Sequence, residues 1–191
     1  MPPMQAGTSL GNHFLIALPA MSDPNFSKGV TLLCHHNDEG AMGILLNRLS
    51  AYRLGDVLQQ MDLRTEDNEL AAAPVLLGGP VQPERGFVLH DPTGTDWDST
   101  FAISATLHLT TSRDILAAMA RGEGPRRAVV ALGYAGWSSG QLEDELQANA
   151  WLTVEADNRI LFDTPLESRW SGAARLMGVD LNRITTYSGR A

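Results

Sequence analysis

Two apolar runs joined by a short polar turn limit this chain to folds that contain an antiparallel sheet. Val30, Leu32, Cys34 and His36 recur at every second position, as on a strand whose successive side chains point to opposite faces. Four polar residues, 37–40, follow, and a second apolar run leads to Asn47. Strand, turn and strand predict a β-hairpin over residues 29–47, with Cys34 near its tip.

Further strands and helices are expected on both sides of this hairpin. Apolar or alternating runs predict strands at residues 13–19, 75–77, 86–90, 101–104, 127–134 and 151–155. Helical spacing and end signals predict helices at residues 54–61, 111–122, 138–148 and 164–177, the last two capped by Ser138 and Thr164. Residues 66–73 are expected to form a surface loop. Strands mixed with helices at irregular intervals indicate an α+β fold with a mixed sheet.

Length and composition fit one domain. The 191 residues are 43% hydrophobic and 19% charged, which is typical of a soluble globular protein. We expect a single domain over residues 1–191, with loose termini at 1–12 and 185–191. A single cysteine cannot form an internal disulfide and suits a reducing compartment. No early run has the length of a membrane span or the features of a signal peptide, so we expect a cytoplasmic protein without a membrane partner.

The charge balance argues against nucleic acid as a partner. The formal net charge is -8, and a field of that sign repels phosphate backbones. Arg121, Arg126 and Arg127 form the only compact basic cluster in the sequence, and three charges give weak affinity at physiological salt. Direct DNA binding is therefore not expected.

Cys34 with His36 is the leading candidate for chemistry. On a regular strand the two side chains share a face, and an imidazole beside a thiol can lower the thiol pKa and make it nucleophilic. The alternative is that Cys34 is a small buried apolar residue, because free cysteines are among the most buried residue types. The sequence favours the buried alternative, since no third group that would orient the pair can be identified.

A ligand site is a second possibility. Asn47, Gly78, Gly79 and His90 are the candidates, and they would form such a site if they lined a common groove with Cys34 and His36. The glycines could let backbone N–H groups approach an anion, although turn geometry explains them better. Adjacent His35 and His36 point to opposite strand faces, and no zinc-binding spacing is present, so we expect no metal site and no cofactor.

Five sequence blocks resemble one protein family. They are residues 18–26 (LPAMSDPNF), the Cys34 hairpin, residues 77–81 (LGGPV), residues 86–90 (GFVLH) and residues 133–142 (GYAGWSSGQL). In this order they are similar to the bacterial YqgE/AlgH family over nearly the whole chain. The resemblance implies a bifurcated mixed β-sheet with a small closed barrel-like part, flanked by helices.

The resemblance implies no activity. The family is biochemically uncharacterised, and one member carries the label of a regulator of alginate transcription. The first hypothesis is a non-enzymatic regulatory or interaction module that binds an unknown protein or small molecule. The second is a thiol-dependent enzyme or redox sensor that uses Cys34 and His36. The third, transcription regulation by direct DNA binding, conflicts with the charge.

Overall fold

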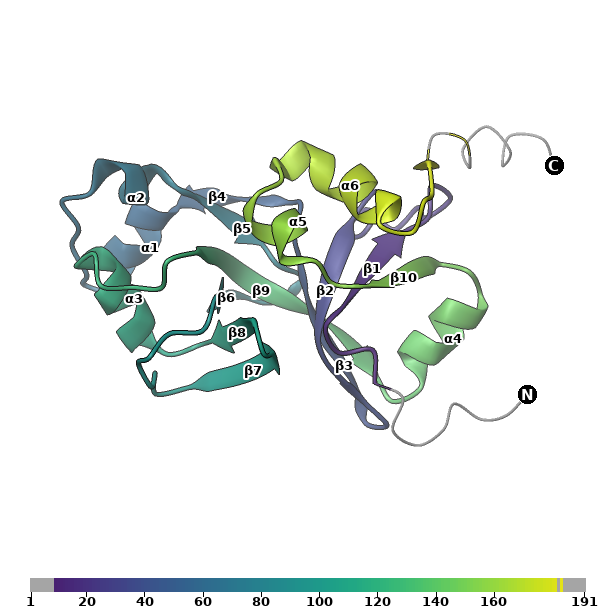
Figure 1. The fold of residues 1–191 in the computed structure, drawn as a ribbon, viewed down its shortest axis with the longest axis horizontal. Coiled ribbons are helices and arrows are strands. Elements are labelled where there is room, and N and C mark those ends of the chain that lie inside the picture. The colour runs from purple at the N-terminus through teal and green to yellow at the C-terminus, as the bar shows by residue number, and fades with distance from the viewer. Residues whose placement is uncertain (1–8, 182, 184–191) are drawn as a thin grey trace.

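The computed structural model describes residues 9–181 and 183 of the chain. Its strands are β1 (His13–Ala17), β2 (Val30–Asn37), β3 (Gly40–Leu45), β4 (Leu49–Arg53), β5 (Pro74–Leu77), β6 (Val81–His90), β7 (Thr100–Ser104), β8 (Leu107–Thr110), β9 (Ala128–Ser138) and β10 (Trp151–Glu155). Its helices are α1 (Leu54–Gln60), α2 (Asn68–Ala72), α3 (Arg113–Ala120), α4 (Gln141–Gln147), α5 (Asn158–Phe162) and α6 (Arg169–Arg175), with one 3-10 turn at Leu166–Ser168. Figure 1 shows α1, α2 and α3 gathered at one end of the sheet.

The strands form one sheet that divides at β9. The main path runs β10-β1-β2-β3-β9-β6-β8-β7, and a branch of β4 and β5 joins it at β9. The first half of β9 pairs with β5 in parallel, whereas its last four residues pair with β3 in antiparallel. β6 lies along the other edge of β9. The expected α+β fold with a bifurcated mixed sheet is confirmed, and its barrel-like part is a curled half-barrel (Figure 1).

Glycines make this division possible. Gly133 has a φ of 77°, and a Cβ there would lie 2.5 Å from the carbonyl oxygen of Gly79. A Cβ on Gly79 would in turn come within 2.2 Å of the Tyr134 carbonyl oxygen. Gly78 links both branches, because its N–H donates to Leu132 and its carbonyl accepts from Leu45. Only residues without side chains allow backbones to cross this closely.

Three apolar clusters hold the helices against the sheet. The largest contains Phe14, Leu32 and Phe87 and lies under α5 and α6, whose Ile160 and Ala173 belong to it. The second joins α1 and α3 to strands β5, β6 and β9. The third lies under α4 and contains Trp137 and Trp151.

Most expected elements are present, and several were not foreseen. The hairpin is confirmed as β2 and β3. Sequence reasoning missed β4, β8 and α5, which are short and carry weak periodicity. Residues 66–73 were expected to be a loop, which is wrong, since α2 lies there with Asp67 accepting from the N–H groups of Glu69 and Leu70.

Both expected threonine and serine caps are wrong. Ser138 is the last residue of β9, and its hydroxyl donates to the Gln141 side chain, while Gly140 precedes α4. Thr164 donates to the Arg159 carbonyl at 2.9 Å. Local sequence fits a cap at either position, but the hydrogen-bonded ladder with β3 extends β9 through Ser138.

The expectation that residues 1–12 form a loose terminus is wrong for residues 9–12. Residues 9–12 are anchored, because Leu10 donates its N–H to the His36 ring at 3.0 Å and Asn12 donates to the Leu33 carbonyl at 2.8 Å. The expected loose segments at residues 1–8 and 185–191 lie outside the described residues.

Candidate functional site

Cys34 and His36 lie on opposite faces of β2, so the expectation that they share a face is wrong. Leu33 pairs with Gly43, but His35 pairs with Met42, so β2 contains one extra residue between these two pairs, which is a β-bulge. Such a bulge places an extra residue in one strand and reverses the alternation beyond it. Cys34 therefore packs into the cluster under α5 and α6, whereas His36 faces α4.

The Cys34 thiol has the surroundings of a core residue. It is 3% exposed, and its Sγ donates a weak hydrogen bond to the Leu32 carbonyl at 3.7 Å. Burial raises the pKa of this thiol to about 12, because the thiolate would lose its hydration. A thiol in this state stays protonated at neutral pH and is a poor nucleophile.

His36 uses both ring nitrogens in structural bonds. Nδ1 accepts the Leu10 N–H, so Nε2 carries the proton and donates to Glu143 Oε1 at 2.5 Å. Burial has the largest single effect on Glu143 and would raise its pKa, but the hydrogen bond from His36, a backbone hydrogen bond and the charge of His36 together outweigh it, so the pKa of Glu143 is lowered. The imidazole therefore ties the N-terminal segment and β2 to α4.

The four predicted ligand residues do not form one site. Asn47 lies in the bend between β3 and β4, where its Oδ1 accepts the Val30 N–H and its Nδ2 donates to the Lys28 carbonyl. His90 is fully buried, with Nδ1 donating to the Asp91 carbonyl and Nε2 accepting from the Thr110 hydroxyl, each at 2.7 Å. Gly78 and Gly79 pack against β9. The structure thus keeps Gly78 and Gly79 together against β9 and places Cys34, His36, Asn47 and His90 in different environments.

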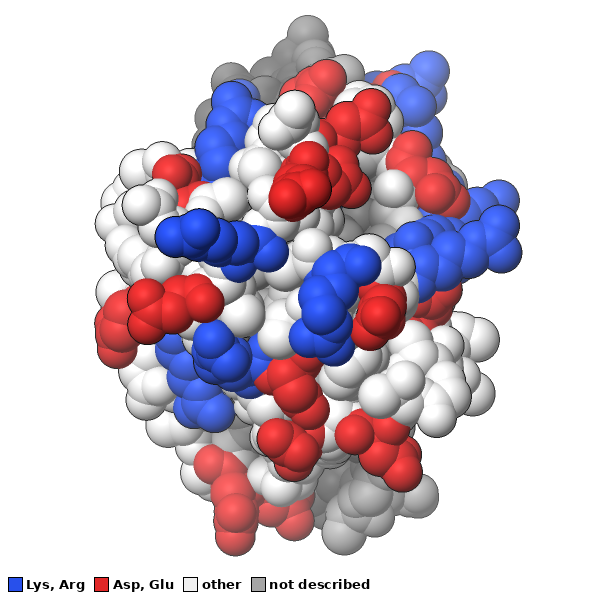
Figure 2. Space-filling model, turned by 90° about the vertical axis from the view of Figure 1, so that its left-hand side faces the viewer, with Lys and Arg blue, Asp and Glu red and all other residues white. Residues whose placement is uncertain are grey.

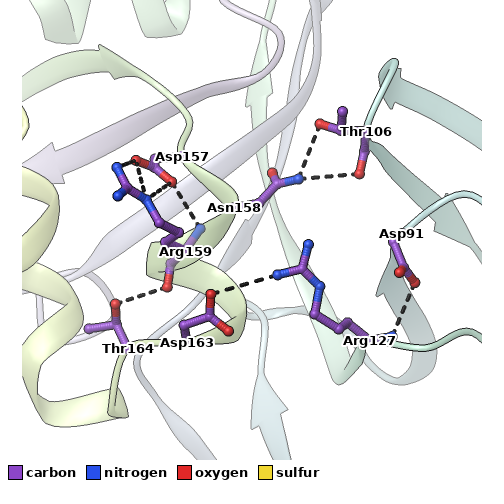
Figure 3. Close-up of polar contacts among 8 residues, drawn as sticks. All are labelled: Asp91, Thr106, Arg127, Asp157, Asn158, Arg159, Asp163 and Thr164. Atoms are coloured by element: carbon purple, nitrogen blue, oxygen red, sulfur yellow. Dashed lines mark hydrogen bonds and ion pairs between the residues drawn. The ribbon is translucent and has the colours of Figure 1, made fainter.

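Two arginines of the basic cluster, Arg121 and Arg127, form contacts with other residues of the fold. Arg127 lies over the Phe162 ring at 4.9 Å. Its guanidinium also reaches Asp163 at 3.6 Å, which links the start of β9 to the end of α5 (Figure 3). Arg121 pairs with Glu123 at 3.3 Å. These pairings reduce the positive charge that a phosphate backbone would meet.

The described residues show neither a cluster of metal-binding side chains nor a helix that could span a membrane. No group of three or more His, Cys, Asp or Glu side chains there is arranged to hold a metal ion. None of the helices in that part of the chain has the length and apolar character to cross a bilayer.

Two surface features were missed by sequence reasoning. The first, here called the β4 surface, consists of the exposed side chains Leu49, Tyr52 and Leu77 and a cavity of about 360 Å³ beside Tyr52. The second, here called the fork groove, is a depression of about 680 Å³ where β3, β9, β6 and β8 lie side by side. Its lining includes Met42, Arg85, Phe87, Tyr134 and Gly136. The only sequence signal for the groove was Gly136, a glycine inside an apolar strand.

Comparison with known proteins places the chain in a family. The model of the AlgH-like family matches residues 14–182. The chain belongs to the AlgH-like family. This confirms the resemblance that the five sequence blocks carry.

Relatives of this AlgH-like protein match it over nearly its whole length. A UPF0301 protein of Xanthomonas campestris pv. campestris strain B100 is 59% identical, covering 96% of this chain and 97% of that protein. A UPF0301 protein of Stenotrophomonas maltophilia strain K279a is 58% identical, covering 95% and 96%.

Solved structures show the same fold. The solution structure of the AlgH protein from Pseudomonas aeruginosa matches with a TM-score of 0.79 and 47% identity, over 96% of each chain. A crystal structure of a Corynebacterium diphtheriae protein matches with a TM-score of 0.70 at 18% identity, over 91% of this chain and 90% of that one. The second likeness concerns the fold alone, and none of these four names states an activity.

Proposed function

We propose that this AlgH-like protein is a non-enzymatic regulatory module of the cytoplasm, which binds another protein through the β4 surface. The observation that carries the proposal is an unpaired sheet edge, β4, at which apolar side chains of β4 and of its neighbour β5 are exposed. Leu49 is 57% exposed, Tyr52 46% and Leu77 38%. Within the described chain only β5 pairs with β4, so the outer edge of β4 has no strand neighbour.

The β4 surface suits an extended, weakly charged segment of a partner. Soluble proteins usually protect such edges with charges, prolines or a covering element, yet Arg53 is the only charged residue on β4. A partner strand could add to the edge through main-chain hydrogen bonds. One of its apolar side chains could enter the cavity beside Tyr52, which is lined by Val57, Met61 and Leu116.

The enzymatic alternative has less support. A thiol mechanism needs an accessible thiolate and a base within hydrogen-bond reach. Cys34 is buried, and His36 faces the other side of the sheet and is bonded to Glu143. A redox sensor needs the same accessible, low-pKa thiol.

A pair of matched variants tests the proposal. Leu49→Lys adds a charge to the β4 surface, and Phe101→Lys adds one to β7, at another exposed apolar residue on a sheet-edge strand. Tagged wild type and both variants would be used to capture partners from cytoplasmic extract under cross-linking. We expect partners that bind wild type and Phe101→Lys but are lost with Leu49→Lys, and whose cross-links map to β4. Equal capture by both variants, or cross-links elsewhere, would refute the assignment.

A further inference from the structure

The fork groove combines one unpaired cation with aromatic and apolar walls. Arg85 is the only charged residue that lines it, and in the described part of the chain its guanidinium has no ion pair or hydrogen bond. The guanidinium lies 5.5 Å above the Phe87 ring centre. Phe87 and Tyr134 meet edge to face at 5.8 Å, and Met42 lines the groove from β3.

A glycine keeps the groove open. Gly136 sits opposite Met42 in the ladder of β9 with β3, in the interior of a strand where glycine weakens the sheet. A Cβ on Gly136 would meet only the Tyr134 ring, at an ordinary contact distance of 3.6 Å. Its backbone dihedrals are not of the kind that demand glycine, because it is absent from the positive-φ residues. Packing and conformation therefore do not explain a glycine here, whereas close approach of a flat ligand does.

We infer that the fork groove binds a small planar aromatic monoanion of the aryl carboxylate class. The flat ring would lie over Gly136 with its edge toward Tyr134, as aromatic pairs prefer. Its carboxylate would pair with the Arg85 guanidinium, whose planar fork matches a carboxylate.

The charge of the molecule limits the ligand to a single negative charge. One cation lines the groove, and the chain as a whole carries -8. A polyphosphate would be repelled by the overall field without enough local cations to offset it. The depression of about 680 Å³ is within the usual size of small-molecule sites, and its open form suits one fused ring system.

The first experiment compares three probes by isothermal titration calorimetry and amide chemical-shift mapping. They are 2-naphthoate, the neutral 2-naphthamide and the non-aromatic cyclohexanecarboxylate. We expect 2-naphthoate to bind about tenfold more tightly than either of the others, with shifts at Met42, Tyr134 and Gly136 and affinity that falls with salt. Equal affinities for the three probes, no binding of 2-naphthoate, or shifts elsewhere would overturn the inference.

The second experiment uses matched variants. Arg85→Gln should remove the preference for 2-naphthoate over the amide, and Arg85→Lys should restore part of it, whereas Arg64→Gln in a separate cavity should have no effect. Gly136→Ala should weaken 2-naphthoate binding by about tenfold through lost space, while Gly86→Ala, at another strand glycine, should not. Unfolding curves show that each variant is folded. If Gly136→Ala binds like wild type, or if the two arginine positions behave alike, the site is wrong. These results do not depend on the β4 surface.

Discussion

At the residue scale, burial decides what the chemically interesting side chains can do. Cys34 lies in the core and its thiol pKa is raised to about 12, so native protein should resist alkylation at pH 8 and react after unfolding in urea. His36→Ala should leave the labelling rate of the folded protein unchanged, because the ring faces the other side of β2. Mass spectrometry of timed iodoacetamide reactions measures this. Fast labelling near pH 6 that depends on His36 would instead support the thiol enzyme.

His90 should make stability depend on pH. Burial lowers its pKa, nearby His108 acts in the same direction, and the bond to the Asp91 carbonyl opposes them. In the unfolded chain the histidine pKa returns to about 6.5, so below that value the unfolded state binds more protons than the folded state. The contribution of His90 is therefore complete above about pH 6.5 and is lost as the pH falls toward the lowered folded value.

Urea unfolding between about pH 5 and 7.5 tests the His90 contribution. His90→Gln should show a shallower loss of stability toward low pH than wild type. His35→Gln, at an exposed histidine, is the control and should keep the wild-type slope. The same slope in all three proteins would show that His90 does not titrate as described.

At the element scale, tertiary hydrogen bonds decide where helices begin. Asp67→Ala removes the acceptor for two N–H groups at the start of α2 and should lower the free energy of unfolding by about 1 kcal/mol. Ser138→Ala should change it little, since the Ser138 hydroxyl caps no backbone N–H. Chemical denaturation compares the two. If Ser138→Ala lowered the free energy of unfolding more than Asp67→Ala does, the sequence-based prediction that Ser138 is a helix N-cap would be supported instead.

Glu145, in the second turn of α4, is held by two indoles. Glu145 Oε1 accepts from the Nε1 groups of Trp137 at 3.1 Å and Trp151 at 3.0 Å. Glu145→Ala leaves two buried indole donors without this acceptor and should cost about 2 kcal/mol or more. Asp144→Ala, at an exposed neighbour, should stay within about 0.5 kcal/mol of wild type. Tryptophan fluorescence during urea unfolding measures the stability of both variants. Equal losses of stability in Glu145→Ala and Asp144→Ala would argue against the indole contacts.

At the scale of the whole molecule, the charge distribution bears on the regulator hypothesis. Figure 2 shows Lys and Arg interspersed with Asp and Glu over the end that carries α1, α2 and α3. With a net charge of -8, the protein should bind duplex DNA no more tightly than another acidic protein of its size. Fluorescence anisotropy with labelled duplexes at about 150 mM salt measures this. Submicromolar affinity that falls steeply with salt would reverse the conclusion.

Much of the fold follows from local sequence. Alternation in residues 30–36, a polar turn and a second apolar run up to Asn47 were enough to predict the hairpin. The helix ending at Gly122 was equally clear from its apolar face and its terminal glycine. Short elements such as β4 and α5 were missed, because they carry too few residues to show a period and depend on contacts with distant parts of the chain.

By itself the sequence determined the α+β class, the hairpin and the membership of the AlgH-like family. Only the tertiary structure decided that Cys34 and His36 point apart, since the bulge arises from pairing between β2 and β3 and is held by the bonds of His36 to Leu10 and Glu143. It also decided the division of the sheet, where Gly79 and Gly133 meet although 53 residues (80–132) separate them in the chain. The local spacing of residue types cannot predict such crossings, because they are stabilised by contacts between backbone segments that lie far apart in the sequence.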